Sequence, residues 1–347
     1  MRFSHAMGDS SWVDAQHEGV LVEVRRGVYV ESMHRVSFCV ARSDGEVLCR
    51  AGDVDLAFPI RSLAKPFIAS ELVRSGAADA FVLTDAELAL SAGSHDGEAR
   101  HIAAVRGVLL KLGVTDDVLR CGSAMEGTIV VGPPIANNCS GKHAAVIALC
   151  RHLGFDVAGY IEPEHPVQIY LQRRLREAFG RAALASPLAV DGCGMPIFGA
   201  PLRDVAAAYA RFGCSREPAV ARVRAAIAAR PEYVGGWDGN LDSSISAESG
   251  GAVFGKIGAE GLHADALIPA GLGLAVKVLD GNSRALGPIL ARVFVEYAPD
   301  GFEESYLARL ARPVLYNAAG SVIGDVRLRA GTVALGGLPM RRSRTAE

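Results

Sequence analysis

Runs of strand-forming residues at both ends of the chain, separated by a long helical stretch, constrain the fold most. Near the N-terminus, residues 20–24 and 36–41 are rich in Val and other strand formers. The Asp44-Gly45 dipeptide follows them, and Asp-Gly is a favoured sequence for a two-residue hairpin turn. We therefore predict that the N-terminal segment forms antiparallel strands.

The middle of the chain has a different pattern, in which apolar residues recur at helical spacing. A glycine ends each of the clearest stretches, as expected of the residue that closes many helices. The predicted helices span residues 102–112, 143–153 and 166–179. This region is therefore expected to form a helical lobe, from about residue 62 to residue 240.

Strand patterns return after Gly250, in residues 272–278 and 313–329, with one predicted helix over 285–297. We expect these strands to complete the N-terminal sheet. The sequence thus predicts an α+β fold, with an antiparallel sheet from about 19–60 and 250–340 and a cleft where the sheet meets the helical lobe. Since no low-complexity linker interrupts it, 19–347 is predicted to be one catalytic unit behind a flexible leader, 1–18.

Composition excludes several classes of partner. The net charge is -2 and no Lys/Arg run is present, which argues against nucleic acid. No apolar stretch reaches the roughly 18 to 20 residues that span a membrane, and the N-terminus has no secretory signal pattern. The seven cysteines are scattered, so reduced thiols, a cytoplasmic location and a small-molecule substrate are expected.

Ser62 and Lys65 form a Ser-x-x-Lys pattern at a predicted strand-to-helix transition. Positions i and i+3 share one face of a helix, so the lysine amine can reach the serine hydroxyl. The positive end of the helix dipole opposes protonation of that amine, which makes Lys65 a candidate general base and Ser62 a candidate nucleophile. The pattern is also compatible with a helix cap followed by an exposed lysine.

Two further clusters precede predicted helices or tight turns. Ser94, between Gly93 and Gly97, is either a second hydroxyl facing the cleft or part of a helix cap. Cys139 and Cys193 are compatible with a metal site, although there is no Cys-x-x-Cys motif. Alternatively Cys139 is a thiolate nucleophile with His143 as its base, or a small buried residue.

Six motifs in this order resemble the Rhizobium etli-type L-asparaginase II family, from about Gly19 onward. They are Arg61-Ser62-x-x-Lys65-Pro66-Phe67, Ser94-His95-x-Gly97-Glu98, Asn137-Asn138-Cys139-Ser140-Gly141-Lys142-His143-Ala144, Asp191-Gly192-Cys193-Gly194, Lys256-x-Gly258-Ala259-Glu260-Gly261 and Asp280-Gly281-x-Ser283-Arg284-Ala285. The resemblance implies a fold similar to serine β-lactamases and penicillin-binding proteins, hydrolysis of L-asparagine to L-aspartate and ammonia, and a homodimer.

The resemblance also assigns site residues. It implies two Ser/Lys tandems, Ser62 with Lys65 and Ser94 with Lys256. It implies a zinc site made of Cys139, Lys142 and Cys193. The substrate-binding residues that it implies are Arg61, Asp191 and His143. Lysine is an unusual zinc ligand because only its neutral amine coordinates. The zinc is expected to shape the site and anchor substrate. The chain departs from the family at Ile257, where a second glycine is common.

Two alternatives remain open from the residues. A penicillin-recognising serine acyl hydrolase shares Ser-x-x-Lys, but it is expected to carry Ser-x-Asn and Lys-Thr-Gly or Lys-Ser-Gly elements, to which Lys256-Ile257-Gly258 is only a distant approximation. The second alternative is a catalytically disabled protein that binds zinc or a ligand. The presence of every expected Ser and Lys argues against it.

Overall fold

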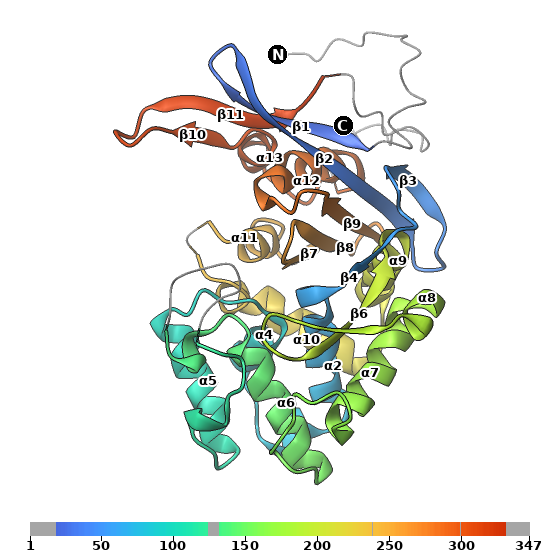
Figure 1. Cartoon of the computed structure of the whole chain (residues 1–347), viewed down its shortest axis with the longest axis vertical. Coiled ribbons are helices and arrows are strands. Elements are labelled where there is room, and N and C mark those ends of the chain that lie inside the picture. Colours follow the sequence, from blue (N-terminus) through green and yellow to red (C-terminus); the bar gives the residue numbers. More distant parts are fainter. Residues whose placement is uncertain (1–18, 124–131, 238, 299, 331–347) are drawn as a thin grey trace, which may run out of the picture.

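The computed structural model describes residues 19–123, 132–237, 239–298 and 300–330. It has an α+β fold, in which a sheet built from both ends of the chain lies beside a helical lobe (Figure 1). The predicted fold class is therefore confirmed. The predicted leader, 1–18, and the last part of the predicted sheet region lie outside the described residues.

The main sheet has 8 strands, all paired antiparallel. They are β1 (Val20–Arg26), β2 (Tyr29–Arg42), β3 (Val47–Ala51), β7 (Val253–Gly258), β8 (Leu262–Leu267), β9 (Leu272–Val278), β10 (Val314–Tyr316) and β11 (Val322–Leu328). Their order is β10-β11-β1-β2-β9-β8-β7, and β3 also pairs with β2. Because β1 pairs with β11 and β2 with β9, the C-terminal strands complete the N-terminal sheet as predicted.

The first hairpins differ from the expectation in detail. The turn between β1 and β2 lies at Gly27, whereas the Asp44-Gly45 turn joins β2 to β3. Arg42 N–H donates to Glu46 C=O at 2.9 Å, so the connection has three residues rather than the predicted two. Gly45 has a φ of 96°, the left-handed conformation that closes hairpin loops of this length.

Twelve α-helices and five short 3₁₀ turns make up the helical part of the described chain. The α-helices are α2 (Lys65–Arg74), α3 (Ala77–Ala80), α4 (Asp85–Ala92), α5 (Ala99–Lys111), α6 (Ser140–Leu153), α7 (Pro166–Phe179), α8 (Arg181–Ala185), α9 (Leu202–Cys214), α10 (Pro218–Ala229), α11 (Leu241–Glu248), α12 (Leu286–Tyr297) and α13 (Glu304–Ala311), and a 3₁₀ turn at Arg61–Ala64 precedes α2. The predicted helices correspond to α5, α6, α7 and α12. A small second sheet, order β4-β6-β5, joins the lobe to the main sheet and was not predicted; its strands are β4 (Ala57–Pro59), β5 (Leu188–Val190) and β6 (Pro196–Pro201).

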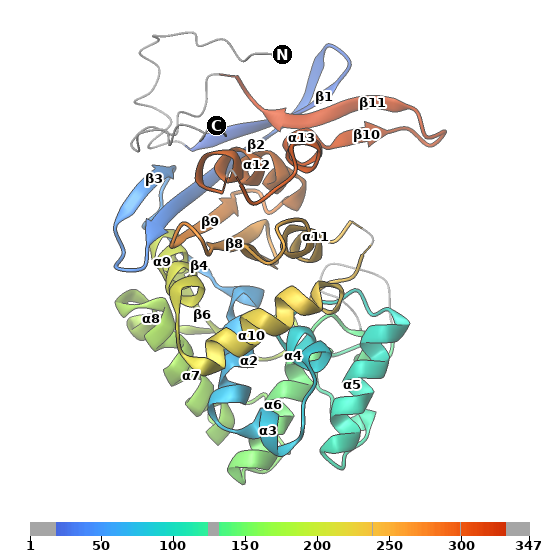
Figure 2. The ribbon, with the colours of Figure 1, turned by 180° about the vertical axis from the view of Figure 1, so that it is seen from behind.

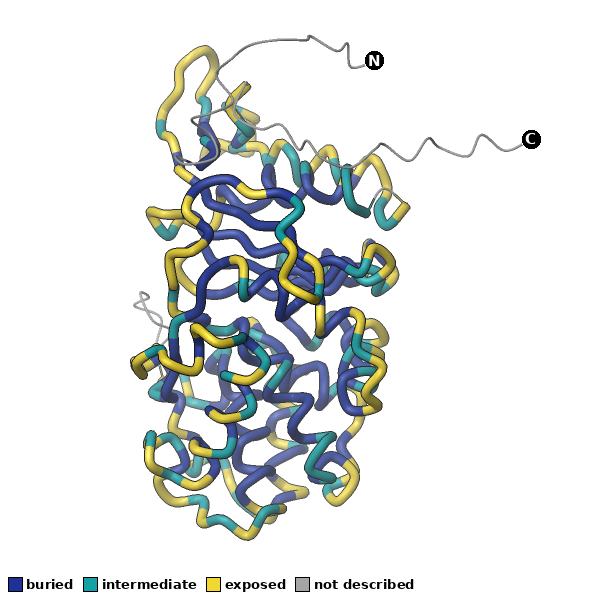
Figure 3. Tube along the Cα trace, turned by 90° about the vertical axis from the view of Figure 1, so that its right-hand side faces the viewer, coloured by how far each residue is buried: buried dark blue, intermediate teal, exposed yellow. Residues whose placement is uncertain are grey.

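The two faces of the main sheet are buried against different helices. On β2, Phe38 and Val40 pack with α12 in one hydrophobic cluster. Cys39 and Ala41 point to the other face and join the core shared with α9 and the helical lobe. The buried residues therefore form a continuous core from the sheet into the lobe (Figure 3). This arrangement is expected because successive strand residues point to opposite faces of a sheet.

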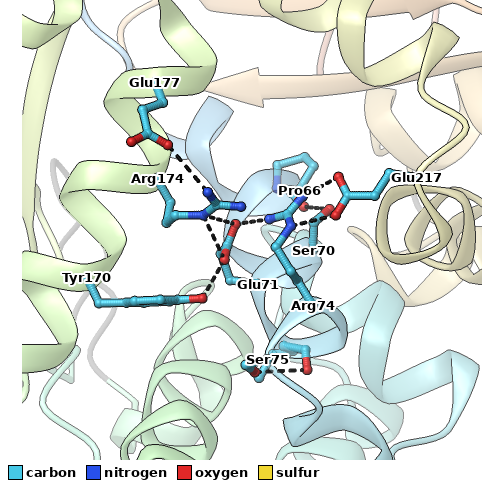
Figure 4. A network of polar contacts seen from close by, with 10 residues as sticks. Pro66, Ser70, Glu71, Arg74, Ser75, Tyr170, Arg174, Glu177 and Glu217 are labelled. Carbon is cyan, nitrogen blue, oxygen red and sulfur yellow. Dashed lines mark hydrogen bonds and ion pairs between the residues drawn. The ribbon is translucent and has the colours of Figure 1, made fainter.

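Helix α2 carries Lys65 at its start and is anchored near its end. Glu71 is buried and receives hydrogen bonds from Tyr170 Oη at 2.6 Å and from Arg74 and Arg174 (Figure 4). Arg74 also binds Glu217, the residue before α10, with two contacts of 2.6 Å. This network ties α2 to α7 and α10, and Figure 2, the view from behind, shows α10 crossing in front of α2.

Within the described ranges, every helix falls short of the length and apolar content that a membrane-spanning helix needs.

Candidate active site and metal centre

A cavity of about 270 Å³ lies where the turn between β7 and β8 meets the helical lobe. Its walls come from segments far apart in the sequence. They are Arg61, Ser62, Ser94, Asn137, Asn138, Cys139, Asp191, Gly192, Cys193, Ile257, Gly258, Ala259, Glu260, Gly261, Gly281 and Ser283. The cavity thus brings together residues from all six motifs.

Lys65 lies directly behind this cavity, fully buried at the start of α2. Its Nζ atom donates to Ser94 Oγ at 2.8 Å and to the backbone carbonyl of Asn138 at 3.1 Å. Burial lowers the pKa of Lys65, and the positive charges of Lys142 and Lys256 lower it further. The amine is therefore suited to accept a proton.

Ser62 and Ser94 both line the cavity. Lys65 contacts Ser94 rather than Ser62, and in the described part of the chain the Ser62 hydroxyl makes no hydrogen bond. The loop that holds Ser94 is fixed by Gly93, where a Cβ would lie 2.2 Å from the carbonyl oxygen of Val234. His95, beside it, contacts Ser140 Oγ at 2.9 Å and fixes the loop to α6.

The partner of Lys256 is an acid, Asp242, whereas the resemblance implied a tandem of Lys256 with Ser94. Lys256 is fully buried on β7 and forms an ion pair with Asp242, whose side chain is also fully buried. The other carboxylate oxygen of Asp242 accepts the Ile257 N–H at 2.7 Å, and Lys256 Nζ donates to the Ile257 carbonyl at 3.0 Å. Lys256 and Asp242 thus support, from behind, the strand whose Ile257 lines the cavity.

The thiols of Cys139 and Cys193 meet at the opposite wall. Cys139 directly precedes α6, and Cys193 lies in a tight turn closed by Gly194, which has a φ of 86°. The thiol sulfurs and a carboxylate oxygen of Asp191 lie within 4.8 Å of one another. Lys142 Nζ completes the group, at 2.9 Å from Cys193 Sγ and 3.4 Å from Asp191.

The protonation of this cluster follows from its contacts. The hydrogen bond with Cys193 lowers the pKa of Cys139, and the positive charges of Lys65 and Lys142 add to this effect against the cost of burial. Burial disfavours the ammonium form of Lys142, but Cys193, Cys139 and Asp191 together raise its pKa. A metal bound through Lys142 must therefore displace a proton.

The donor set fits a metal ion. Two buried cysteine sulfurs beside a carboxylate and an amine match the preference of Zn²⁺ for sulfur ligands in closed sites. The hydrogen bond to Cys139 and burial raise the pKa of the Cys193 thiol, so a metal held there must displace its proton as well. Cys139, Asp191 and Cys193 form a group that could hold a metal, and Lys142 is the fourth donor of the cluster.

Arg61 and Asp191, the two charged residues predicted to bind substrate, contact each other. Arg61 Nε donates to Asp191 Oδ1 at 2.6 Å, and the same oxygen accepts the Gly192 N–H at 3.0 Å. Although burial opposes it, the charges of Lys142 and Arg61 lower the pKa of Asp191. The Asp191 carboxylate thus joins Arg61 to the thiol cluster.

His143 lies outside the cavity wall. Its side chain is fully buried and Nδ1 contacts Tyr160 Oη at 2.6 Å, while Nε2 has no partner among the described residues. Burial lowers the pKa of His143, so the ring is neutral. The His143 backbone N–H donates to the Cys139 carbonyl at 2.9 Å, but among the described residues the His143 ring and the Cys139 thiol make no hydrogen bond with each other.

Three residues of the site carried no role in the sequence analysis. Asp242 follows Asn240, the cap of α11, and looks there like an ordinary first-turn acid. Tyr160 lies in a loop, and only the fold shows that it meets His143. Glu260 belongs to the motif around Lys256, and its glycine-rich neighbourhood was the one available signal that its turn is special.

Comparisons with known proteins give one family and several solved structures, among them a β-lactamase and Mglu. A family model described as L-asparaginase II matches residues 22–328. A β-lactamase from Mycobacterium bovis is similar at 19% identity and a TM-score of 0.39, covering 76% of this chain and 94% of that one. Mglu, crystallised in its native form in 4.3 M NaCl, is similar at 16% identity and a TM-score of 0.35, covering 83% and 67%. Curated protein sequences gave no match.

Proposed function

Because the chain belongs to the L-asparaginase II family, we propose that it hydrolyses the side-chain amide of L-asparagine to L-aspartate and ammonia, in the manner of the Rhizobium etli-type enzymes that its motifs resemble. The observation that carries the proposal is the 2.8 Å contact between Lys65 Nζ and Ser94 Oγ beside a cavity that Ser62 also lines. A buried amine next to two hydroxyl groups is an arrangement for acyl transfer.

Lys65 acts as the general base in this proposal. Burial and the charges of Lys142 and Lys256 favour its neutral form, which can take a proton from a serine. Lys256 is paired with the buried carboxylate of Asp242, so it places a positive charge near Lys65 and does not serve as a second base. Lys256 thus acts electrostatically, and Ser94 has Lys65 as its lysine partner.

The acylation step begins when Ser62 Oγ attacks the side-chain amide carbon of asparagine and its proton passes to Lys65 Nζ. As the tetrahedral intermediate collapses, the C–N bond breaks and the proton passes from Lys65 through Ser94 Oγ to the departing nitrogen, which leaves as ammonia. An aspartyl ester of Ser62 remains. We assign the attack to Ser62 because its Ser-x-x-Lys motif resembles the first tandem of the family, while Ser94, which also lines the cavity, holds the amine of Lys65 by a hydrogen bond.

Deacylation reverses the roles. Lys65 accepts a proton from a water molecule that attacks the ester carbonyl, the ester C–O bond breaks, and Ser62 regains its proton from Lys65 while aspartate leaves. Ser94 positions the lysine amine in both steps through the same hydrogen bond. One base thus serves both halves of the reaction.

Zinc is the metal that we propose for the thiol cluster, with Cys139, Cys193 and either Lys142 or Asp191 as the residues that would hold it. When bound, it supplies a positive charge that can anchor polar atoms of the substrate. Asp191 also orients Arg61, which lies beside Ser62 and can receive the substrate carboxylate.

Ammonia release from L-asparagine and L-glutamine by the purified full chain tests the function. We expect asparagine to be hydrolysed, and acid quenching followed by peptide mass spectrometry to locate an aspartyl ester on Ser62. Absence of ammonia release from asparagine by the folded, zinc-supplied protein rejects the proposal. An ester on Ser94 or Cys139 instead moves the nucleophile to that residue.

A further inference from the structure

Asparagine carries an α-ammonium and an α-carboxylate besides the amide that reacts. A site that selects amino acids over simple amides needs a counter-charge for each of these groups. Two carboxylate side chains, Asp191 and Glu260, line the described cavity. They are the candidates for binding the ammonium group.

Asp191 is already engaged. One oxygen binds Arg61 at 2.6 Å and Gly192 N–H at 3.0 Å, and the other lies 3.4 Å from Lys142 Nζ. A substrate ammonium at this carboxylate would compete with two positive charges that the protein itself supplies. Asp191 therefore offers little negative potential to the substrate.

Glu260 has the opposite character. It lies in the three-residue turn between Gly258 and Leu262, is exposed, and within the described chain its carboxylate makes neither a hydrogen bond nor an ion pair. The nearest lysine, Lys277, donates its Nζ hydrogens to the backbone carbonyls of Glu260 at 2.5 Å and Val278 at 2.6 Å, not to the carboxylate. Lys277 thus fixes the backbone of the turn, and it acts on the Glu260 carboxylate through its charge without a hydrogen bond to it.

The backbone of Glu260 is in an unfavourable conformation. Its φ is 63°, and the other described non-glycine residues with positive φ are Arg61, at 45°, and Val82, at 49°. Two of these three residues line the same cavity. Such strain persists where the surroundings hold it and is concentrated at ligand sites.

Gly281 provides the space for the carboxylate. A Cβ atom on Gly281 would lie 2.4 Å from Glu260 Oε2, so the acid rests against the backbone of a second cavity-lining turn. Two contacts thus determine the position of Glu260. Lys277 holds the Glu260 main chain, and the backbone of Gly281 lies against the Glu260 side chain.

We propose that Glu260 binds the α-ammonium group of the amino acid substrate and thereby selects α-amino acids over amides that lack this group. The inference rests on the proposed function. Glu260 takes no part in the transfer of the acyl group; its contribution is a charge-assisted hydrogen bond to a group that stays unchanged in the reaction. Its loss therefore weakens binding of substrate and transition state alike.

The test compares two ligands, L-asparagine and succinamic acid, which is asparagine without the α-amino group. Binding of each is measured by calorimetry to Ser62→Ala, with and without Glu260→Gln or Glu260→Asp. We expect Glu260→Gln to weaken asparagine binding by about tenfold to a hundredfold, since a hydrogen bond to a charged group contributes roughly 1.5–3 kcal/mol, and to leave succinamic acid binding within about twofold. Glu260→Asp should retain part of the preference for asparagine.

Glu164→Gln is the matched control, an exposed glutamate outside the cavity wall, and should change neither affinity. Equal weakening of both ligands by Glu260→Gln, or no weakening of asparagine, overturns the inference. So does absence of asparagine binding to Ser62→Ala. Turnover by the unmodified chain is measured separately, so a protein that binds asparagine through Glu260 without hydrolysing it contradicts the proposed function and not this inference.

Discussion

Three lysines lie close together around the cavity, and their charges influence one another. Lys65 has its pKa lowered first by burial and then by the charges of Lys142 and Lys256. Each of the other two has an acidic or thiol partner, whereas Lys65 has a hydroxyl and a carbonyl. The partner of each lysine therefore determines which of the three serves as the base.

The pH dependence of turnover follows from this assignment. The base must be neutral, and the neutral fraction of Lys65 rises with pH through its folded-state pKa, which lies below the roughly 10.4 of a free lysine. We expect kcat/KM for asparagine to rise along a limb whose midpoint is well below that value, and Lys65→Met to lose nearly all turnover. Rates measured from pH 6 to pH 10 check this. A flat profile with chemistry rate-limiting would contradict lysine as the base.

The buried pair of Lys256 and Asp242 gives a stability prediction. Asp242→Asn removes the counter-charge of a fully buried ammonium, and breaking such a pair costs about 3–5 kcal/mol. Urea denaturation should show a loss of this size. Asp79→Asn, in an exposed pair with Arg222, should lose less than about 1 kcal/mol. Similar losses for the two variants would show that the buried pair adds little.

Which residues enter the site could largely be predicted, but their partners could not. The family resemblance implied site roles for Ser62, Ser94 and Cys139, and all three line the cavity. The hydrogen bond of Lys65 to Ser94 was not predictable, because the i, i+3 spacing on a helix suggests Ser62 instead. Asp242 lies 14 residues before Lys256, and only the packing of α11 on β7 brings the two together.

Among the elements, α9 and β9 make the closest contact between helix and sheet. A Cβ atom on Gly273 would lie 2.0 Å from the carbonyl oxygen of Ala206, so β9 and α9 meet backbone to backbone. Gly273→Val should therefore separate them and destabilise the fold by more than about 3 kcal/mol. Gly113→Ala, at a helix end with open space and a φ of 68°, should cost about 1 kcal/mol. Equal denaturant midpoints for the Gly273→Val and Gly113→Ala variants would contradict this close packing.

Elements with strong end signals were predicted well. α7 has the predicted bounds of 166–179, because Pro166 starts it and Gly180, with a φ of 92°, ends it. β5, of three exposed residues, and α13, of eight, have no comparable signals. Short elements of this kind depend on the neighbours that they pair with, which the local sequence does not contain.

In the whole molecule, one hydrophobic cluster spans the sheet and the lobe. Ala264 and Ala275 of the sheet belong to the same cluster as Leu72 and Leu149 of the helices. We expect the predicted single unit to unfold in one step. Far-ultraviolet and near-ultraviolet circular dichroism should then give the same denaturant midpoint. Two separated midpoints would instead indicate two units that unfold independently.

Zinc binding by the thiol cluster should stabilise the folded protein. If zinc binds the folded thiol cluster and not the unfolded chain, adding it must raise the melting temperature, and Cys193→Ser must abolish this rise. Cys214→Ser is the control, because Cys214 is the exposed cysteine remote from the cluster. No zinc-dependent rise in the unmodified chain would show that the cluster binds no zinc.

Zinc titration of the metal-free enzyme then separates its two possible roles. Anchoring of the substrate contributes equally to the ground state and the transition state, so removal of zinc should raise KM for asparagine many-fold with a smaller fall in kcat. Generation of the nucleophile by zinc would give the opposite pattern, with Ser62→Ala retaining substantial activity. We expect the first pattern, because Ser62, which lines the cavity, is the nucleophile in the proposed mechanism. A kcat that follows zinc occupancy at saturating asparagine would contradict the anchoring role.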